Sequence, residues 1–194
     1  MARKLDGKKI AILATDGVEQ VELTEPRKAL EDAGATTELV SLQAGEIQGF
    51  DHLDHADKLK VDRVLSDVSA DEYDGLLIPG GVANGDFLRA DEDAVKFTAD
   101  FAGAHKPIAA ICHAPWVLVE AGIVKGRTIT SFPSLKTDVR NAGGTWVDEE
   151  VHVDHGLVTS RKPDDIPAFS AKAIEEFCEG PHDDMPQPAG AATA

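Results

Sequence analysis

One of the two cysteines in this 194-residue chain stands where a reactive thiol is expected. Residues 107–111 form a short apolar run, PIAAI, that ends directly at Cys112, and the segment 115–122 begins with proline and ends with glycine, as helices often do. A cysteine between a strand and a helix lies on a tight turn that tolerates only small neighbours, here Ala110 and Ala114. The N-terminus of the following helix favours thiolate over thiol. We therefore predict that Cys112 is a nucleophile on such an elbow, and not an inert buried cysteine.

Backbone N–H groups are expected to flank the reacting centre. The N–H group of His113, the residue after the predicted nucleophile, is a natural donor to an oxyanion. The turn Pro79-Gly80-Gly81 follows a neighbouring apolar run, and glycine lets the backbone approach a substrate closely, which makes Gly81 the second candidate donor. The turn is not a dinucleotide-binding fingerprint, because the G-x-G-x-x-G spacing is absent.

A carboxyl group is expected beside the thiol. Ligands of open α/β sheets bind beyond the carboxyl ends of the strands, so the loop at residues 15–20 should face Cys112, and Glu19 is the carboxylate that we select there. A buried carboxyl group near a thiolate has a raised pKa and can share its proton with the sulfur or with a reacting oxygen. The alternative is that Glu19, like Glu22 and Glu25, is an acidic residue in a first helical turn, where the helix dipole favours it.

Strand-like and helix-like segments alternate along the chain, and they must position these residues. Short apolar runs predict strands, and amphipathic spacing between charged residues predicts helices. Strands are predicted at residues 9–15, 37–42, 73–79, 107–111, 128–131, 151–153 and 157–160, short hairpin strands within 44–62, and helices at 19–33, 91–104, 115–121 and 164–179. This alternation predicts an α/β fold with a mainly parallel sheet covered by helices on both faces.

The length fits one compact domain that buries a core without disulfides or metal. We predict a single domain at residues 1–179. The tail at residues 180–194, GPHDDMPQPAGAATA, lacks apolar periodicity and is predicted to be disordered.

Charge and cysteine content restrict the partners and the compartment. The chain has 19 Lys and Arg residues against 35 Asp and Glu residues, a net charge of −16 that repels phosphate backbones and anionic lipids. Neither nucleic acid nor membrane is an expected partner. Two cysteines are too few for a secreted disulfide framework, and the sequence has no apolar stretch of the signal-peptide or membrane-spanning type, so a cytoplasmic location is predicted.

A histidine-rich and aspartate-rich segment, DHLDHAD at residues 51–57, is the one metal-like pattern considered. Its H-x-x-H spacing places two imidazoles near each other, but cysteine is absent and an acidic surface loop explains the composition. We predict no metal and no cofactor.

Several motifs, in this order along the chain, together resemble the PfpI-type superfamily, which includes intracellular protease I, stress-response proteins, deglycases and glyoxalases. They are VEQVEL around Glu19, the PGG turn, AICH at residues 110–113, GRTITSFPSLKTDVRNAG, and TSRKPDDIPAF. The resemblance covers residues 8–177. It implies a flavodoxin-like three-layer sandwich, similar to class I glutamine amidotransferases, that assembles as homodimers or larger rings.

The resemblance also implies roles for individual residues. Cys112 would be the nucleophile and Glu19 the acid beside it, while Gly81 and the His113 N–H group would form the oxyanion hole. In the peptidase-like branch, a carboxylate from a neighbouring subunit orients the histidine, and Asp86 in VANGDFLR is the nearest match. A glutamine amidotransferase is disfavoured, because its histidine comes from a later part of the chain.

Three functions remain open at this point. The preferred one is a stress-response enzyme that acts on reactive carbonyls or their protein adducts, in which the Cys112 thiolate attacks and Glu19 and His113 carry protons without a cofactor. The second is an intracellular cysteine peptidase that uses Cys112, His113 and Asp86 across a subunit interface. The third is a redox sensor or chaperone-like protein in which Cys112 is oxidised to a sulfinate held by Glu19.

Overall fold

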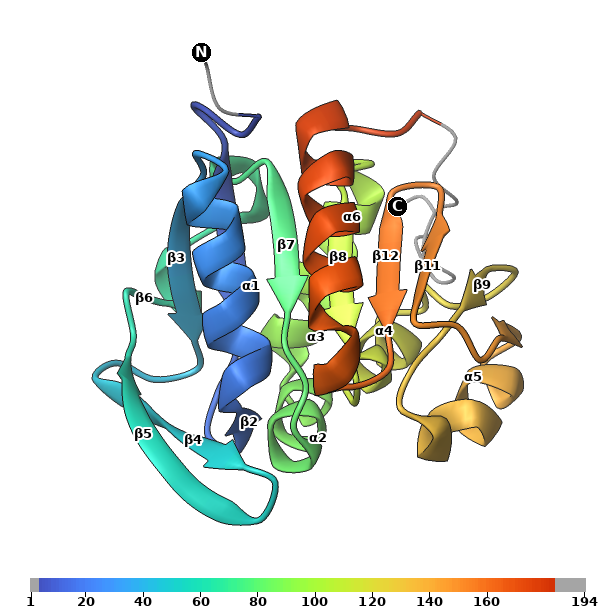
Figure 1. The fold of residues 1–194 in the computed structure, drawn as a ribbon, viewed down its shortest axis with the longest axis horizontal. Coiled ribbons are helices and arrows are strands. Elements are labelled where there is room, and N and C mark those ends of the chain that lie inside the picture. Colours follow the sequence, from blue (N-terminus) through green and yellow to red (C-terminus); the bar gives the residue numbers. More distant parts are fainter. Residues whose placement is uncertain (1–3, 184–194) are drawn as a thin grey trace.

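A seven-stranded sheet forms the centre of the molecule in the computed structural model, which describes residues 4–183 (Figure 1). Its strands are β1 (Lys9–Leu13), β3 (Thr36–Ser41), β6 (Arg63–Val64), β7 (Gly75–Ile78), β8 (Ile108–Ile111), β11 (Val151–Asp154) and β12 (Leu157–Ser160). Their order is β11-β12-β8-β7-β1-β3-β6, and all neighbours are parallel except β11 and β12. The predicted mainly parallel α/β class is confirmed.

Helices cover both faces of this sheet. They are α1 (Gln20–Asp32), α2 (Val82–Ala90), α3 (Glu92–Gly103), α4 (Pro115–Glu120), α5 (Lys136–Asn141) and α6 (Ile166–Glu179). In Figure 1, α1 and α6 lie in front of the sheet, α3 and α4 lie behind it, and α2 lies beyond the end of β7. The chain therefore has the three layers expected of the predicted sandwich. Within residues 4–183, none of the helices is both long and apolar enough to cross a membrane.

Smaller elements lie around this core. One small sheet has the order β2-β4-β5, from β2 (Val18–Glu19), β4 (Glu46–Asp51) and β5 (Asp54–Lys60), and another pairs β9 (Thr128–Ile129) with β10 (Thr145–Trp146). Short 3-10 helices occur at Leu65–Asp67, Ala70–Glu72, Pro133–Leu135 and Pro163–Asp165. The hairpin of β4 and β5 lies within residues 44–62, where hairpin strands were predicted.

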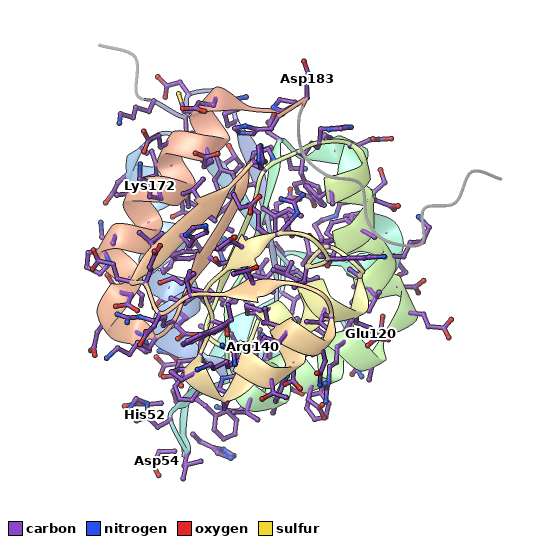
Figure 2. The ribbon with its side chains drawn as sticks, turned by 90° about the vertical axis from the view of Figure 1, so that its right-hand side faces the viewer. His52, Asp54, Glu120, Arg140, Lys172 and Asp183 are labelled. Atoms are coloured by element: carbon purple, nitrogen blue, oxygen red, sulfur yellow. The ribbon has the colours of Figure 1, made fainter. Side chains whose placement is uncertain are left out.

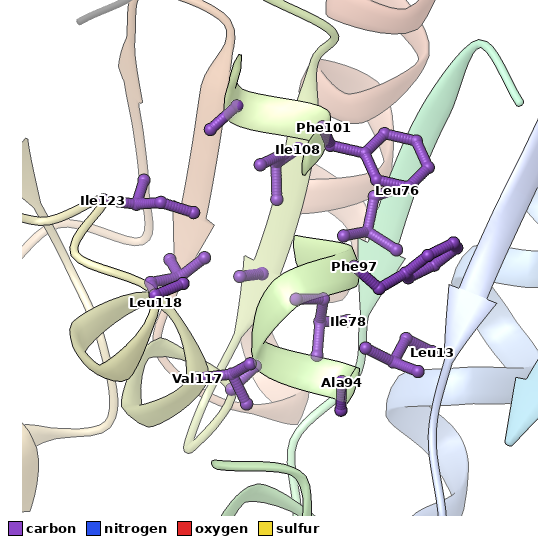
Figure 3. Close-up of a cluster of buried hydrophobic side chains, with 14 of the residues drawn as sticks. Leu13, Leu76, Ile78, Ala94, Phe97, Phe101, Ile108, Val117, Leu118 and Ile123 are labelled. Carbon is purple, nitrogen blue, oxygen red and sulfur yellow. The ribbon is translucent and has the colours of Figure 1, made fainter. Parts of the chain in front are cut away.

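The parallel strands are buried on both faces, which explains their unbroken apolar runs. In β1, Ala11 and Leu13 pack into the cluster beside α3 and α4, whereas Ile10 and Ile12 pack into the cluster beside α1 and α6. The first of these clusters includes Leu13, Leu76, Ile78, Phe97, Phe101 and Val117 (Figure 3). The sheet is thus held between two packed layers, and the carboxyl ends of β1, β7 and β8 meet at one fixed edge.

The predicted elements agree with the structure to within a few residues, with two exceptions among the helices. The sequence predicts neither α2 nor α5, and α2 directly follows the PGG turn. The predicted disordered tail also needs correction at its start. His182 N–H donates to the His105 carbonyl at 2.9 Å, so this part of the chain is docked, and residues 184–194 lie outside the described residues. The single-domain boundary at residue 179 stays a prediction.

Candidate active site

Cys112 lies directly after β8, on the turn that leads into α4, where the sequence indicated an elbow. Its backbone φ is 62°, in the left-handed region that residues other than glycine rarely adopt. Main-chain hydrogen bonds hold this conformation: Cys112 N–H donates to the Ser160 carbonyl at 3.0 Å, and the Cys112 carbonyl accepts from Phe132 N–H at 2.9 Å. Backbone strain of this kind persists only where contacts with the surrounding structure hold the residue in place. The turn leaves the Cys112 residue 7% exposed at the sheet edge.

The carboxyl group against the Cys112 sulfur belongs to Glu22 and not to Glu19, which corrects the prediction. Glu22 is fully buried in the first turn of α1, and a Cβ atom on Gly80 would lie 2.3 Å from Glu22 Oε2 and 2.6 Å from Cys112 Cβ, so the carboxyl group lies beside the thiol. Its Oε2 atom accepts from Gly80 N–H at 2.9 Å. The PGG turn therefore holds the carboxyl group next to Cys112.

Glu19 occupies the N-cap position of α1 and lies toward the β4–β5 hairpin. Its carboxylate accepts from His52 N–H at 3.1 Å. Glu22 lies three residues later and shares the buried face of the helix with Pro26 and Leu30. The spacing i, i+4, i+8 of these three residues is the signal that could have identified Glu22, because an acidic residue on an apolar stripe needs a buried partner.

The N–H groups of Gly81 and His113, the predicted oxyanion donors, lie near enough to the Cys112 sulfur to lower the pKa of the thiol. Gly81 has a φ of 98°, and a Cβ atom there would lie 2.2 Å from the Gly17 carbonyl oxygen. A Cβ atom on Gly80 would lie 2.6 Å from Cys112 Cβ. The PGG turn therefore needs both glycines for its close approach to the thiol.

Asn84, for which the sequence predicted no role, holds this turn in place. Its fully buried amide donates to the Pro79 carbonyl at 2.9 Å and to the Gly80 carbonyl at 3.1 Å. Its Oδ1 atom accepts from Thr15 N–H at 2.8 Å. One side chain on α2 thus ties the end of β7 to the loop after β1, next to the thiol.

The His113 ring lies beside the sulfur. Its Nδ1 atom is 3.2 Å from Cys112 Sγ, and its Nε2 atom is 3.4 Å from Ser134 Oγ. The ring stacks on Phe132 with centroids 4.7 Å apart and meets Trp116 edge to face. Burial lowers the pKa of His113. At neutral pH it is a neutral imidazole that can accept a proton at the sulfur.

Asp86 does not contact the His113 ring within the described residues. Its carboxylate accepts two hydrogen bonds from Arg89 on the same helix, at 2.9 and 2.7 Å, and its side chain is 55% exposed. Arg89 also lies over the Trp116 ring at 4.5 Å. A His113–Asp86 contact therefore requires a second copy of the chain.

Burial raises the pKa of both Glu22 and Cys112. The pKa of Glu22 rises to about 8, with a further contribution from the charge of Glu19. For Cys112, burial is the largest cause and the Glu22 charge the second, while the N–H groups of Gly81 and His113 act in the opposite direction. Burial thus outweighs the acidifying effect that the sequence predicted for the thiol. Because two adjacent buried negative charges repel each other, ionisation of either Glu22 or Cys112 disfavours ionisation of the other. The first proton is therefore lost by the pair as a whole.

The metal-like segment at residues 51–57 does not bring its two histidines together on one ion. His55 meets the Phe50 ring at 4.8 Å, whereas His52 lies with Asp51 and Glu19, with potential ligand atoms within 4.8 Å of one another. His52 and Asp54 extend from the hairpin end of the molecule (Figure 2). The Glu19 carboxylate of this group already accepts the His52 N–H bond, which explains the arrangement without an ion.

The geometry combines a thiol, a carboxyl group that can carry its proton, a neutral imidazole and two N–H donors. A parallel α/β sheet that carries this set of groups at the carboxyl ends of its strands defines a class of proteins whose site is suited to thiol chemistry. The chain belongs to the DJ-1/PfpI family, whose model matches residues 8–176. The resemblance to PfpI-type proteins is thereby confirmed.

Curated relatives carry different functional names. The chain is 45% identical over 168 residues to the protein named "Putative cysteine protease YraA" of Bacillus subtilis, and 41% identical over 169 residues to "Protein/nucleic acid deglycase 2" of Escherichia coli. Each alignment covers 86% of this chain and 96% of the relative. Among solved structures, Drosophila melanogaster DJ-1beta matches with a TM-score of 0.81 at 26% identity, over 88% of this chain and 90% of that chain. These matches support an enzyme of this family and leave its reaction open.

Proposed function

We propose that this protein is a cysteine-dependent enzyme that consumes α-oxoaldehydes or repairs their thiol and amine adducts. The observation that carries the proposal is the fully buried Glu22 carboxyl group, which the Gly80 N–H group holds beside Cys112. A carboxylic acid with a pKa near 8 keeps its proton at neutral pH and can deliver it to an oxygen that becomes negative during attack.

The proposed reaction begins at the sulfur. The N–H groups of Gly81 and His113 lower the pKa of the thiol, whereas burial and the Glu22 charge raise it. We assign the reaction to the state in which the Cys112 sulfur carries the negative charge of the pair and Glu22 holds the proton. The thiolate adds to the aldehyde carbon, forming a C–S bond. The electron pair of the C=O bond moves to oxygen, which takes the Glu22 proton next to the N–H groups of Gly81 and His113.

The next step isomerises the bound hemithioacetal. Neutral His113 accepts the C–H proton of the hemithioacetal carbon and returns it to the neighbouring ketone carbon, while a hydroxyl proton moves between the two oxygens, so that a 2-hydroxy thioester results. Water then cleaves the C–S bond and releases a 2-hydroxy acid and the thiol. The net change is addition of one water molecule, so no external oxidant or reductant is consumed.

Peptide cleavage is the second candidate, supported by the name of the Bacillus subtilis relative. A peptidase of this kind needs a carboxylate that orients His113. Within one chain, Asp86 is ion-paired with Arg89 at 2.7 Å and His113 faces Ser134, so this need is met less well. Cys112 is also only 7% exposed, which suits a small carbonyl better than an extended backbone. The name of the Escherichia coli relative supports the carbonyl reaction.

A side-by-side assay tests the proposal. Wild type and Cys112→Ser are compared for consumption of methylglyoxal, repair of its thiol adducts, and cleavage of a fluorogenic peptide. We expect carbonyl activity that disappears in Cys112→Ser, with little peptide cleavage. Peptide cleavage that depends on Cys112, without carbonyl activity, would favour the peptidase. Neither activity, together with peroxide oxidation of Cys112, would favour a redox sensor.

A further inference from the structure

A second group of ionisable side chains lies at the other end of β8 from Cys112. Glu176 and Glu179 are in the last turn of α6, and His182 follows the helix. The potential ligand atoms of these three residues lie within 4.8 Å of one another. In Figure 2, Asp183, the residue after His182, lies at the opposite end of the molecule from His52 of the β4–β5 hairpin. This group takes no part in the proposed reaction.

The most informative contact in this group joins two buried atoms. Glu176 Oε2 and His182 Nε2 are 3.1 Å apart, yet each lacks a hydrogen bond within residues 4–183. The distance between the two atoms is that of an ion pair, but their geometry is not that of a hydrogen bond. Glu176 is only 7% exposed, and its Oε2 atom faces His182 Nε2 without forming a hydrogen bond. A buried polar atom without a partner is costly and calls for an occupant.

The separation of the two atoms suits a shared metal ion. Zinc binds histidine nitrogen and carboxylate oxygen at about 2.0–2.2 Å, so two ligands of one tetrahedral ion lie roughly 3.3–3.6 Å apart. The 3.1 Å distance between Glu176 Oε2 and His182 Nε2 is close to this range, so a small movement of either side chain would accommodate the ion. Glu179, which is exposed, can approach as a third ligand and leave the fourth position to water.

The charges around the group also call for a cation. Two carboxylates stand at the C-terminal end of α6, where the helix dipole is negative, and the last turn of this helix has no basic residue. A divalent cation would neutralise the negative charges of both carboxylates, whereas a protonated His182 would neutralise only one.

The backbone around His182 is already fixed in position. His182 N–H donates to the His105 carbonyl at 2.9 Å, and His105 Nδ1 is 3.0 Å from the His182 carbonyl oxygen. Such paired contacts orient a ligand before the metal arrives, which favours binding. The imidazole ligand favours zinc or another late transition ion over magnesium or calcium.

We propose that Glu176, Glu179 and His182 form a binding site for a zinc-type divalent metal ion that fastens the segment after α6 to the last turn of α6. The role of such an ion would be structural, because the site is remote from Cys112. It would stabilise the folded protein by binding it in preference to the unfolded chain.

Calorimetric titration of tag-free, EDTA-treated protein with ZnCl2 tests the site. We expect one Zn²⁺ per chain in wild type, with binding at least about tenfold weaker in His182→Ala and in Glu176→Gln. The matched control is His52→Ala, which removes the histidine of the Glu19–Asp51–His52 group and should bind like wild type. The proposal is overturned if wild type does not bind, if both test variants bind like wild type, or if His52→Ala abolishes binding.

Two further measurements distinguish this site from a metal ion held by cysteine or bound without specificity. Co²⁺ bound in place of zinc should give a spectrum without thiolate-to-metal charge transfer, because neither Cys112 nor Cys178 is a proposed ligand; such a band would contradict the site. A hundredfold excess of Zn²⁺ over Kd should raise the Tm of wild type by about 5–10 °C, and that of His182→Ala by much less. Equal shifts in both proteins would also contradict it.

Discussion

At the scale of single residues, the chemistry depends on which group of the Cys112–Glu22 pair holds a proton. Glu22 and Cys112 are both buried and lie side by side, and burial raises both pKa values. Glu19, one helical turn earlier, acts on this pair only through its charge, which raises the pKa of Glu22. The reactive unit is therefore the Cys112–Glu22 pair, with His113 beside it.

The raised pKa of Glu22 should appear in the pH dependence of stability. A carboxyl group with a pKa of 4.5 when unfolded and about 8 when folded stabilises the protein fully below pH 4.5, and this contribution is lost as the pH rises to 8. Glu22→Gln has no such loss. Between pH 5 and 8, the free energy of unfolding of wild type should therefore fall relative to Glu22→Gln by roughly 3–4 kcal/mol. Urea unfolding of both proteins at several pH values measures this difference, and parallel curves would contradict a protonated Glu22.

The reactivity of the thiol gives a second test of the pair. Because the first proton is lost by the pair and the charge is assigned to sulfur, the rate of Cys112 alkylation by iodoacetamide should rise with a midpoint near pH 8. Glu19→Gln should lower this midpoint, since it removes a charge that raises the pKa of Glu22. Peptide mapping separates Cys112 from the exposed Cys178. A midpoint above about pH 10 would place the charge on Glu22 instead.

At the scale of elements, the site is made where three parallel strands end and α2 begins. Asn84 on α2 binds the turn after β7 and the loop after β1, and its side chain is fully buried. The segment VANGDFLRA contains Asn and Gly, which are poor helix formers, so local propensity does not predict α2. Tertiary hydrogen bonds to Asn84 and packing against α4 stabilise this helix instead.

The strands and most of the helices were predictable because each has a local pattern. Apolar runs marked β1, β7 and β8, and small residues around Cys112 marked the elbow, so the position of the thiol followed from sequence. The prediction chose Glu19 over Glu22, because both carboxylates suit a first helical turn and only the apolar face of α1, on which Glu22 lies, distinguishes them. The contact between Asn84 and Thr15 joins residues 69 positions apart, and no local pattern predicts such a pairing.

Replacing Asn84 should destabilise the turns around the site without changing Cys112 itself. Asn84→Ala leaves the Thr15 N–H group and the Pro79 carbonyl without partners and removes one of the two hydrogen bonds of the Gly80 carbonyl, which should lower the free energy of unfolding by about 2–4 kcal/mol. The control is Asp86→Ala on the exposed side of the same helix, where we expect a change below about 0.5 kcal/mol. Denaturant unfolding compares the two, and equal effects would show that the Asn84 hydrogen bonds contribute little.

At the scale of the whole molecule, we propose that the chain forms a homodimer through the α2 side of the site. Val82 and Phe87 on α2 are 57% and 52% exposed, which is unusual for large apolar side chains next to a reacting centre. Asp86 lies on the same helix, so a symmetric contact there could bring it toward the His113 ring of a second copy.

Light scattering at micromolar concentration tests this assembly. Wild type should have the mass of a dimer or a larger ring, and Phe87→Glu should shift it toward the monomer, because a charge would be buried at the contact. The matched control is Leu53→Glu, at a 92% exposed position in the β4–β5 hairpin, which should keep the wild-type mass. A monomeric wild type would remove the proposed interface and, with it, any His113–Asp86 pair.

The central claim is that Cys112 and Glu22, and not Cys112 and Glu19, form the catalytic pair for α-oxoaldehydes. The most direct measurement is kcat/KM for methylglyoxal in wild type, Cys112→Ser, Glu22→Gln and Glu19→Gln under one set of conditions. We predict no activity in Cys112→Ser, a loss of about 10²–10⁴-fold in Glu22→Gln, because the proton-transfer group is gone, and activity close to wild type in Glu19→Gln. A Glu22→Gln enzyme as active as wild type beside an inactive Glu19→Gln enzyme would contradict this assignment.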